Sequence, residues 1–433
     1  MKVCIIGSGY VGLVTGSCLA EIGHTVTCLD IDKKRIKNLK KGIMPIFEPQ
    51  LENLVIKNLK NKNLNFTDSY QDIANQKIFF ICVDTPNNNQ NKPNLKNLFS
   101  VTNSLGKIIN SDSIIVLKST VPLGTNKIVD LKMKKQLPNS IKINIVSNPE
   151  FLREGSAVND FMKPERIIIG TDLQESRELL KSLYKPLCRK SDKIIFMSTE
   201  SAELTKYSAN AFLATKISFA NEVAEIAESI GADMHEVRQG IGSDSRIGKD
   251  FLYAGLGFGG SCFPKDLEAL AHFQRTNSLK SSIITATQER NKYNVSKFIK
   301  KINLNFKQSK KTSLMIWGAS FKPDTDDIRE SLAIEVISAL SKKFQTIYIY
   351  DPEANENAKN FLHTLQNLVF IKNKYNHIPK CDGLVICTEW KEFWNPDYRK
   401  LLGLKEKIIF DGRNILSRQE VEKNNLIYEG IGT

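Results

Sequence analysis

The first thirty residues constrain the fold of this chain most. An apolar, β-branched run over residues 3–6 is followed by the pattern Gly7-x-Gly9-x-x-Gly12, a helix-compatible stretch and a second apolar run that ends at Asp30. Strand, glycine turn, helix, strand and acidic residue in this order are the context of a dinucleotide-binding βαβ unit. The start of the chain therefore predicts a parallel sheet of the Rossmann type.

Each glycine of this turn has a separate role. Gly7 permits the tight turn, Gly9 allows a pyrophosphate to approach the backbone, and Gly12 lets the helix pack closely on the strand. The diphosphate can then lie at the helix N-terminus, which attracts anions. Asp30 follows Gly12 by 18 positions, near the distance expected for a carboxylate that binds ribose hydroxyls. We therefore expect NAD, and not its 2′-phosphorylated relative, as the cofactor.

The rest of the first 200 residues alternates between apolar strands and polar, helix-compatible stretches. This alternation predicts a largely parallel, doubly wound sheet. Ligands of such sheets bind outside the carboxyl ends of the strands. We therefore expect the segments that begin at Asp84, Ser119 and Ser147 to line the cofactor cleft. The further strands are expected at residues 78–83, 114–117, 143–146, 166–170 and 193–197.

The pattern changes after residue 200. Residues 201–230 contain neither proline nor glycine and predict a long helix. A second nucleotide-binding-like half begins near Lys311, but its turn at 318–322 lacks the glycine triad, so we expect it to hold a different phosphorylated ligand. Its elements are expected as strands at 313–317, 346–350, 383–387 and 407–410 and a helix at 329–341.

The predicted fold class is α/β, with two Rossmann-like doubly wound domains joined by a long central helix. The chain is too long for one ordinary core, so more than one domain is expected. The expected domains are an N-terminal NAD-binding domain at 1–200, a central helical domain at 201–305 and a C-terminal Rossmann-like domain at 306–433.

The ten residues from 257 to 266, Gly-Phe-Gly-Gly-Ser-Cys-Phe-Pro-Lys-Asp, form a second informative segment. They place Cys262 after three glycines and shortly before Lys265 and Asp266. Glycines allow a backbone to pass close to a ligand, and a nearby ammonium favours the thiolate, which is the nucleophilic form. We interpret Cys262 as an activated thiol. The alternative is a buried, inert cysteine in a glycine turn.

The bulk composition argues against several classes of protein. The formal net charge of +14 suits an anionic partner, but no basic stripe with interleaved aromatic residues indicates nucleic-acid binding. The eight cysteines contain no C-x-x-C pair and no zinc-ligand spacing, so we expect no metal site and a reducing cytoplasm. The apolar start of the chain continues into the βαβ unit, so we expect neither a signal peptide nor a membrane span.

Four motifs together resemble the UDP-glucose/GDP-mannose dehydrogenase family. They are the glycine turn, Asn-Pro-Glu-Phe-Leu-Arg-Glu at 148–154, the loop of Cys262, and Phe-Lys-Pro-Asp-Thr-Asp-Asp-Ile-Arg-Glu-Ser at 321–331. The resemblance spans nearly the whole chain. It implies a four-electron oxidation in which the C6 alcohol of UDP-glucose becomes a carboxylate while two NAD molecules are reduced. The alternatives are another nucleotide sugar, such as a UDP-N-acetylhexosamine or GDP-mannose, and a sugar-nucleotide sensor without turnover.

The resemblance implies how the sugar is held during this oxidation. Cys262 would capture the aldehyde as a thiohemiacetal, and water would later hydrolyse the resulting thioester. Lys206 and Asn210 would stabilise the developing oxyanion. They are four residues apart and therefore share one helix face. Without the resemblance, such a pair would be interpreted as solvated surface.

The resemblance also implies how water is activated. Glu150 would be the general base for thioester hydrolysis, a task best served by a pKa that burial raises toward neutrality. Asp266 and Thr120 would order the water. The plainer alternatives are that Asp266 only pairs with Lys265 and that Glu150 caps the next helix.

Further contacts are implied by matching motifs. Those to the cofactor are Gly7, Gly9, Val11, Gly12, Asp30, Arg35, Thr85, Thr120, Glu154, Lys265 and Arg329. Those to the sugar nucleotide are Glu150, Phe151, Leu152, Arg153, Glu154, Lys206, Asn210, Phe251, Leu252, Tyr253, Ala254, Gly255, Gly259, Lys322 and Arg413. Arginine and lysine suit a diphosphate, although Lys322 and Arg413 could equally be surface charges. Arg246 would reach the substrate of a neighbouring subunit, which implies a homodimer formed through the helix at 201–230.

Two segments depart from the family pattern. An Asn-rich loop at 87–92 replaces the expected turn containing Asp and Gly, and we expect it to alter only the surface. Trp317 stands where the family usually has a small or aliphatic residue, which could shift packing near the nucleotide site. Neither departure touches the implied chemistry.

Overall fold

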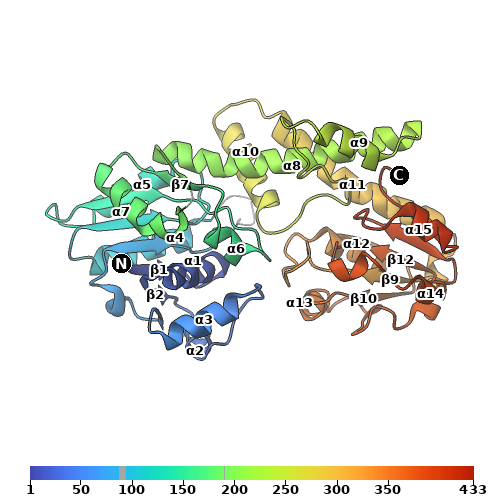
Figure 1. Cartoon of the computed structure of the whole chain (residues 1–433), viewed down its shortest axis with the longest axis horizontal. Helices are drawn as coiled ribbons and strands as arrows, with labels where there is room; N and C mark the ends of the chain where they lie inside the picture. The colour runs from blue at the N-terminus through green and yellow to red at the C-terminus, as the bar shows by residue number, and fades with distance from the viewer. Residues whose placement is uncertain (87–93, 190) are drawn as a thin grey trace. The chain divides into compact units, whose positions relative to one another are not determined.

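The computed structural model describes residues 1–86, 94–189 and 191–433, and the chain divides into two compact units, Met1–Ala209 and Asn210–Thr433 (Figure 1). Each unit contains one sheet with helices packed against it. The predicted α/β class with two Rossmann-like domains and a long central helix is thereby confirmed. The division into three domains stays a prediction, and the Asn-rich loop at 87–92 lies outside the described residues.

The first unit is built on an eight-stranded sheet with the order β3-β2-β1-β4-β5-β6-β7-β8. Neighbouring strands are parallel except β6 and β7. Because the strand order reverses between β1 and β4, the carboxyl ends of these two strands form the crevice in which such sheets bind ligands. The strands are β1 (Lys2–Ile6), β2 (Thr25–Leu29), β3 (Leu64–Thr67), β4 (Ile78–Ile81), β5 (Ser113–Leu117), β6 (Ile143–Ser147), β7 (Ile167–Gly170) and β8 (Ile194–Met197).

Helices cover both faces of this sheet, so successive side chains of β1 enter different cores. Val3 and Ile5 pack with helices α1, α2, α3, α6 and α7, whereas Cys4 and Ile6 pack with α4 and α5. The helices are α1 (Tyr10–Glu21), α2 (Lys33–Leu39), α3 (Leu51–Lys60), α4 (Lys96–Ile108), α5 (Thr125–Lys134), α6 (Ala157–Met162) and α7 (Gln174–Tyr184).

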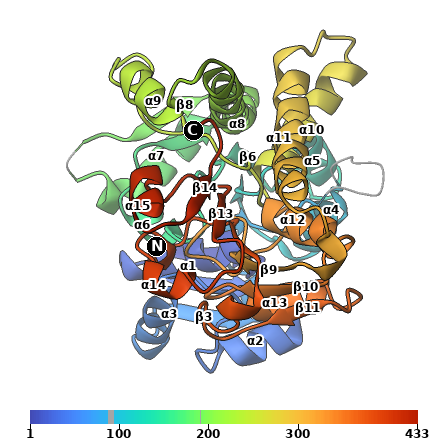
Figure 2. The same ribbon diagram turned by 90° about the vertical axis from the view of Figure 1, so that its right-hand side faces the viewer.

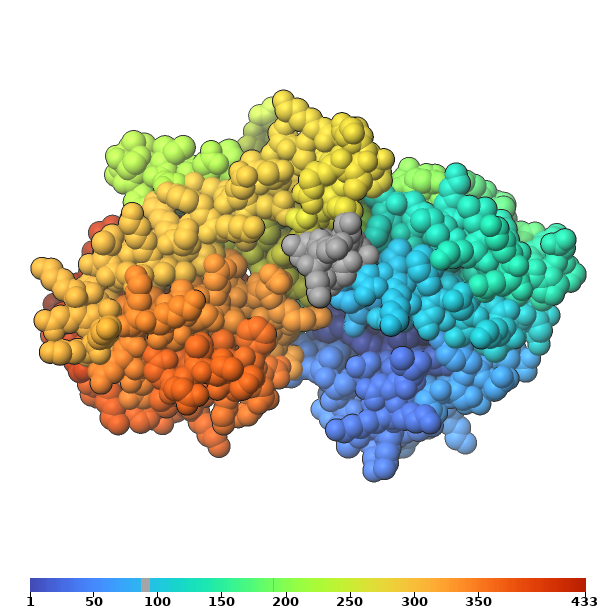
Figure 3. Space-filling model, turned by 180° about the vertical axis from the view of Figure 1, so that it is seen from behind, coloured from blue at the N-terminus to red at the C-terminus, as the bar shows by residue number. Residues whose placement is uncertain are grey.

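Helix α8 (Thr199–Ile230) contains 32 residues and confirms the long helix predicted from residue 201. It is followed by α9 (Met234–Gly242), α10 (Phe263–Thr276) and α11 (Ile283–Asn305). Helices α10 and α11 lie side by side (Figure 2). Their yellow and orange atoms are exposed on the face that Figure 3 shows. Among the residues that the structure describes, no helix combines the length and the apolar character needed to cross a bilayer.

The second unit contains a six-stranded parallel sheet with the order β11-β10-β9-β12-β13-β14. Its strands are β9 (Ser313–Trp317), β10 (Thr346–Tyr350), β11 (Leu368–Phe370), β12 (Gly383–Ile386), β13 (Ile408–Asp411) and β14 (Ile427–Glu429). Its helices are α12 (Leu332–Ser341), α13 (Asn355–Phe361), α14 (Tyr398–Leu401) and α15 (Arg418–Lys423).

Two expectations for this sheet can be compared with the structure. The helix predicted at 329–341 begins only at Leu332, because Glu330 has a left-handed φ of 50° and Ser331 is extended. Trp317 is fully buried, and its ring centroid lies 5.1 Å from that of Phe393. Its indole N–H donates to a backbone carbonyl, so the large side chain is accommodated with its polar group satisfied.

Candidate active site

The glycine turn follows β1 directly, and Gly7 and Gly12 admit no larger residue there. Gly7 has a φ of 97°, and a Cβ on it would lie 2.8 Å from the carbonyl oxygen of Cys82. A Cβ on Gly12 would lie 1.8 Å from the carbonyl oxygen of Gly7. Gly9 is the N-cap of α1, and no side chain caps that end. The first N–H groups of α1 therefore remain available to a pyrophosphate, as the fingerprint requires.

Asp30 is buried directly after β2. Its Oδ2 accepts hydrogen bonds from the backbone N–H of Ser8 at 2.8 Å and from Nη1 of Arg35 at 2.9 Å. The carboxylate is thus fixed beside the glycine turn, where it suits ribose hydroxyls and repels a 2′-phosphate. The turn and this carboxylate together fit NAD.

Replacing Asp30 by alanine is expected to weaken NAD binding at least tenfold, a loss of about 1.4 kcal/mol, because the ribose hydroxyls lose their acceptor. Isothermal titration with NAD and, separately, with the sugar nucleotide measures the change. Asp30→Asn is the matched control, since it keeps an oxygen for Ser8 and removes the charge. If Asp30→Ala weakens both ligands equally, Asp30 is a structural residue and the assignment is wrong.

The other expected cofactor residues of the first unit lie at the same edge of the sheet or in the loop before α6. The Thr85 hydroxyl donates to the carbonyl of Thr120 at 2.6 Å and so joins the segments that follow β4 and β5. Val11 lies in the first turn of α1 and packs against the core. Glu154 lies between β6 and α6.

Glu150 and Lys206 form a buried ion pair within the first unit. The Nζ of Lys206 lies 2.9 Å from Oε1 of Glu150, and both residues are nearly inaccessible to solvent, with side chains 4% and 6% exposed. Oε2 of Glu150 accepts the N–H of Leu152 at 2.6 Å. The ring of Phe151 lies 5.3 Å from the Lys206 ammonium, within cation–π range. The solvated-surface interpretation of Lys206 is therefore wrong.

The pKa of Glu150 is shifted in the direction opposite to the one expected for a general base. Burial alone would raise its pKa, but the charge of Lys206, the hydrogen bonds from Lys206 and Leu152, and the charge of Lys118 together hold the pKa below its usual value. Glu150 is thus a stabilised carboxylate, and the raised pKa that would suit its implied role is not found.

Cys262 stands at the N-terminus of α10 in the second unit. It is the N-cap residue, is partly exposed, and accepts the N–H of Asp266 on its carbonyl. The positive end of the helix dipole favours a thiolate at this position. By contrast, Cys4 and Cys387 lie fully buried, and burial raises the pKa of both thiols, so they are inert.

The glycines before Cys262 are sterically required. A Cβ on Gly259 would lie 2.3 Å from the carbonyl oxygen of Glu330, and one on Gly260 would lie 2.5 Å from the ring of Phe321. The loop therefore runs directly against the segment 321–330, and its course leaves no room for a side chain at either glycine.

Asn210 and Asp266 form a second buried contact, within the second unit. The Asn210 amide donates to Oδ2 of Asp266 at 2.6 Å, and Oδ1 of Asp266 lies 3.0 Å from Nζ of Lys265. Asp266 is 1% exposed and Asn210 7%. Pairing of Asp266 with Lys265 therefore occurs alongside the contact with Asn210, and Asn210 is not the surface residue that its spacing alone would suggest.

The expected sugar-nucleotide loop, Phe251 to Gly255, passes close to the end of β13. A Cβ on Gly255 would lie 3.0 Å from the carbonyl oxygen of Gly412. The N–H of Gly255 donates to Oδ1 of Asn221 on α8 at 3.0 Å. Leu252 and Ala254 are buried, whereas Tyr253 is exposed.

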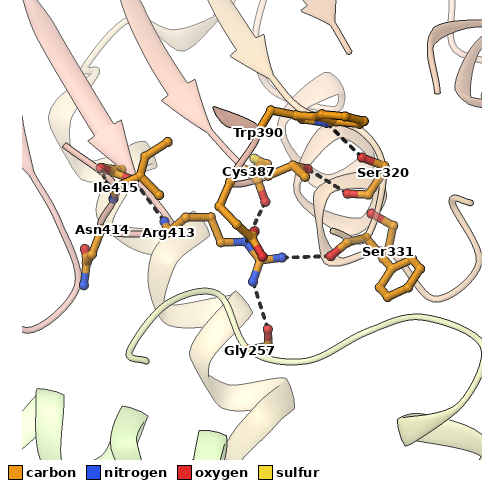
Figure 4. Close-up of polar contacts among 12 residues, drawn as sticks. Gly257, Ser320, Ser331, Cys387, Trp390, Arg413, Asn414 and Ile415 are labelled. Carbon is orange, nitrogen blue, oxygen red and sulfur yellow. Dashed lines mark hydrogen bonds and ion pairs between the residues drawn. The ribbon is translucent and has the colours of Figure 1, made fainter. Parts of the chain in front are cut away.

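Arg413 holds three segments of the second unit together (Figure 4). Its guanidinium donates to the backbone carbonyls of Cys387 at 2.8 Å, Gly257 at 3.1 Å and Phe321 at 3.2 Å. It also lies 3.1 Å from a carboxylate oxygen of Glu389. The interpretation of Arg413 as a surface charge is therefore wrong.

The remaining expected basic residues are more exposed. Arg246 pairs with Asp244 at 2.6 Å and Arg153 with Asp160 at 2.7 Å. Arg329 pairs with Asp327 at 2.6 Å. The Lys322 ammonium lies 5.4 Å from the centroid of the neighbouring Phe321 ring. These contacts neither establish nor remove the implied ligand roles, which stay predictions.

Sequence reasoning missed the residues that support the site. Glu48 accepts the N–H groups of Gly155 and Ala157, both at 2.7 Å, and so holds the start of α6. The alternative that Glu150 caps this helix is therefore wrong. Glu203 accepts the N–H groups of Gly124 and Asn126 at the start of α5. No local pattern marks either glutamate, since their partners lie far away in the sequence.

Within each unit the structure brings part of the implied site together. Glu150 and Lys206 meet in the first unit, and Asn210, Asp266 and Lys265 meet in the second. The first unit thus provides an amine paired with a carboxylate, and the second provides an amine, an amide and a carboxylate in contact, with the thiol of Cys262 at a helix N-terminus. Such groups can stabilise an oxyanion, order water and form a covalent adduct with a carbonyl.

Comparison with known proteins gives consistent results for the whole chain. Three family models match in order: the NAD binding domain of the UDP-glucose/GDP-mannose dehydrogenase family at residues 1–188, its central domain at 200–293 and its UDP binding domain at 315–418. UDP-glucose 6-dehydrogenase of Pseudomonas aeruginosa is 38% identical over 100% of this chain and 97% of its own length. The enzyme of the same name from Rickettsia bellii is 40% identical over the full length of both.

A solved structure supports the same relationship. The chain is similar to a UDP-glucose dehydrogenase from the hyperthermophilic archaeon Pyrobaculum islandicum, with a TM-score of 0.91 and 33% sequence identity. The similarity covers 100% of this chain and 97% of the archaeal one.

Proposed function

Because this chain belongs to the UDP-glucose/GDP-mannose dehydrogenase family, we propose that it oxidises UDP-glucose at C6 to UDP-glucuronate. The observation that carries the proposal is its full-length similarity, at about 40% identity, to enzymes named UDP-glucose 6-dehydrogenase. The chain is an NAD-dependent oxidoreductase, and most of its second sheet lies in the UDP binding domain. The residues needed for turnover are present, which disfavours a sugar-nucleotide sensor.

The first oxidation converts the C6 alcohol to an aldehyde. When bound, NAD accepts a hydride in each of the two oxidations. The ammonium of Lys206 and the amide of Asn210 donate hydrogen bonds to the C6 oxygen as its negative charge develops. A lysine that serves as a charged donor in its pair with Glu150 is poorly suited to accept the hydroxyl proton, so this proton passes to water or to a carboxylate.

The second oxidation uses Cys262. Its sulfur adds to the aldehyde carbon, and the proton that the thiol loses passes through water to the carbonyl oxygen, which gives a thiohemiacetal. Loss of a hydride and a proton from this adduct gives a thioester. Water then attacks the thioester carbon, the C–S bond breaks, and the thiol and the carboxylic acid are released. Glu150 accepts the proton of the attacking water, and Asp266 and Thr120 order that water.

A panel of nucleotide sugars tests the substrate. NADH formation is measured with UDP-glucose, a UDP-N-acetylhexosamine and GDP-mannose, and the sugar product is identified by mass spectrometry. We expect two NADH per sugar with UDP-glucose and the uronate as product. If UDP-glucose yields no NADH while another sugar does, the substrate assignment is wrong. If none does, the sensor hypothesis is favoured.

We also propose that the enzyme is a homodimer formed through α8. Phe212, Phe219 and Ile226 follow one another at intervals of seven residues and therefore lie along one side of the helix. They are 67%, 55% and 55% exposed, and Ile230, one turn further on, is 74% exposed. A stripe of large exposed apolar side chains on a long helix favours burial against a second copy of this chain.

The double substitution Phe212→Glu and Phe219→Glu is expected to convert the dimer to a monomer, because it would bring like charges together in the interface. Sedimentation velocity measures the change. Leu304→Glu on α11, which replaces a side chain 73% exposed, is the matched control and should leave the dimer intact. A wild-type protein that is a stable, active monomer would contradict the proposal.

We also propose that the enzyme is cytoplasmic. Several of its cysteines are buried free thiols, among them Cys4, Cys18, Cys28, Cys82 and Cys387. Buried cysteines in this state suit a reducing compartment.

A further inference from the structure

Lys118 is a buried lysine that the proposed reaction does not use. It follows β5 directly and is 5% exposed. Its Nζ donates to the backbone carbonyl of Asn148 at 3.4 Å and to Oδ1 of the same residue at 3.3 Å. The Tyr184 hydroxyl donates to the same Oδ1 at 2.6 Å, and the Asn148 amide donates to the carbonyl of Ile168 at 2.7 Å. The ammonium is thus fixed to the strand end that carries Glu150, two residues beyond Asn148.

The oxygens that accept from Lys118 belong to an asparagine and so do not neutralise its charge. The ionisable groups that face it are Cys82 after β4, Glu150 after β6, and Lys206 on α8, together with Tyr184 of α7 through Asn148. Burial raises the pKa of Cys82 to about 12 and also raises that of Tyr184, so both are neutral at physiological pH. The charges that Lys118 senses are therefore those of the Glu150–Lys206 pair.

Burial among these groups makes the charge of Lys118 sensitive to mildly alkaline pH. Burial lowers the pKa of Lys118 to about 8; the charge of Glu150 opposes this shift, and that of Lys206 adds to it. In the protonated state, two ammonium groups face one carboxylate, which stabilises Glu150 in its charged form. A carboxylate stabilised in this way accepts a proton from water poorly.

We propose that Lys118 is a positioning residue that sets the basicity of Glu150, and that loss of its proton in mildly alkaline solution makes Glu150 a stronger base. The inference rests on the proposed function, in which Glu150 accepts a proton from water. When Lys118 becomes neutral, the second cation near Glu150 is lost, while the contact of 2.9 Å with Lys206 keeps the carboxylate in place.

The test compares pH profiles of kcat at saturating NAD and UDP-glucose, from about pH 6.5 to about pH 9.5, which brackets the pKa of Lys118. The variants are Lys118→Met, which removes the charge, and Lys118→Arg, which keeps it throughout this range. We expect wild type to follow Lys118→Arg at low pH and Lys118→Met at high pH, with about a threefold change between the two levels. Neither variant should show the inflection near pH 8 that wild type shows.

Tyr184→Phe is the matched control. It removes a buried hydrogen bond to the same Oδ1 of Asn148 without changing any charge, so the inflection should persist. The proposal is overturned if Lys118→Met or Lys118→Arg keeps the wild-type inflection, or if Tyr184→Phe abolishes it, since the effect would then be structural. Lys118→Arg carries the test alone if the methionine variant does not fold.

Failure of the proposed function is a separate outcome. If wild type reduces NAD only with another nucleotide sugar, the substrate assignment fails, and the pH profiles are measured with that sugar. The comparison of variants then still decides the role of Lys118, because a single profile does not identify the group that titrates. If no sugar reduces NAD, both proposals are overturned.

Discussion

Cys262→Ser is expected to bind UDP-glucose and NAD as wild type does but to release the carboxylic acid at least about 10³-fold more slowly. The serine hydroxyl fits the N-cap position of α10, so the loop should keep its conformation. A hydroxyl is a far weaker nucleophile than a thiolate near neutral pH, so the aldehyde is not captured and the second oxidation fails. Acid formation is measured by mass spectrometry, and ligand affinities are measured by isothermal titration.

Cys188→Ser is the matched control for this variant. Cys188 is also only partly buried, but it lies outside the candidate site, and its replacement should leave the rate of acid formation unchanged. If Cys262→Ser forms the acid at the wild-type rate, the covalent step does not occur. If it loses ligand affinity as well as turnover, the loop has been disturbed and the Cys262→Ala variant must show the same loss of acid release with affinity retained.

Lys206→Met is expected to reduce kcat by roughly 10²- to 10³-fold, because the developing oxyanion loses a charged donor. It should also destabilise the protein by about 3 kcal/mol near neutral pH, because Glu150 loses its ion-pair partner in a buried position. The folded-state pKa of Glu150 is lowered, so the pair stabilises the protein above the pKa of Glu150 in the unfolded chain. That stabilisation is lost as the pH falls through the lower folded-state pKa.

The double variant Lys206→Met with Glu150→Gln separates the two effects. A neutral amide removes the unpaired buried charge, so thermal stability near neutral pH should recover toward that of wild type while activity stays low. The difference in melting temperature between Lys206→Met and wild type should also narrow at acidic pH, where Glu150 becomes protonated. A double variant no more stable than Lys206→Met alone would show that the ion pair does not contribute as described.

Much of the fold could be predicted because its signals are local. The β1 turn, with Gly7, Gly9 and Gly12, specifies a βαβ unit within thirty residues, and a run without glycine or proline marks α8. The sequence does not predict strands β3, β11 and β14. They contain only three or four residues and lie at sheet edges, so their apolar pattern is too short to recognise. The sequence predicts the start of α12 three residues too early, because the left-handed conformation of Glu330 has no sequence signal.

The residues of the site could be predicted from the sequence, but their pKa values could not. The motifs mark Glu150, Lys206 and Cys262, yet the pKa of Glu150 is lowered by its contact with Lys206 and, to a smaller extent, by the charge of Lys118, which lies 32 residues away in the sequence. Such a neighbour becomes visible only when β5 and β6 are aligned in the sheet. The position of Cys262 at a helix N-terminus could have been recognised, because Pro264 in the first turn is a common helix-start signal.

The three hydrogen bonds of Arg413 have an evolutionary consequence. All three acceptors are main-chain carbonyls, which every amino acid supplies, so mutations of Cys387 and Phe321 can change the side chains without removing an acceptor. A change at position 413 itself removes all three bonds at once, and lysine cannot replace them, since its single ammonium lacks the planar fork of the guanidinium. Among descendants of this chain, substitutions at the partner positions should therefore be retained, whereas substitutions of Arg413 should be removed by selection.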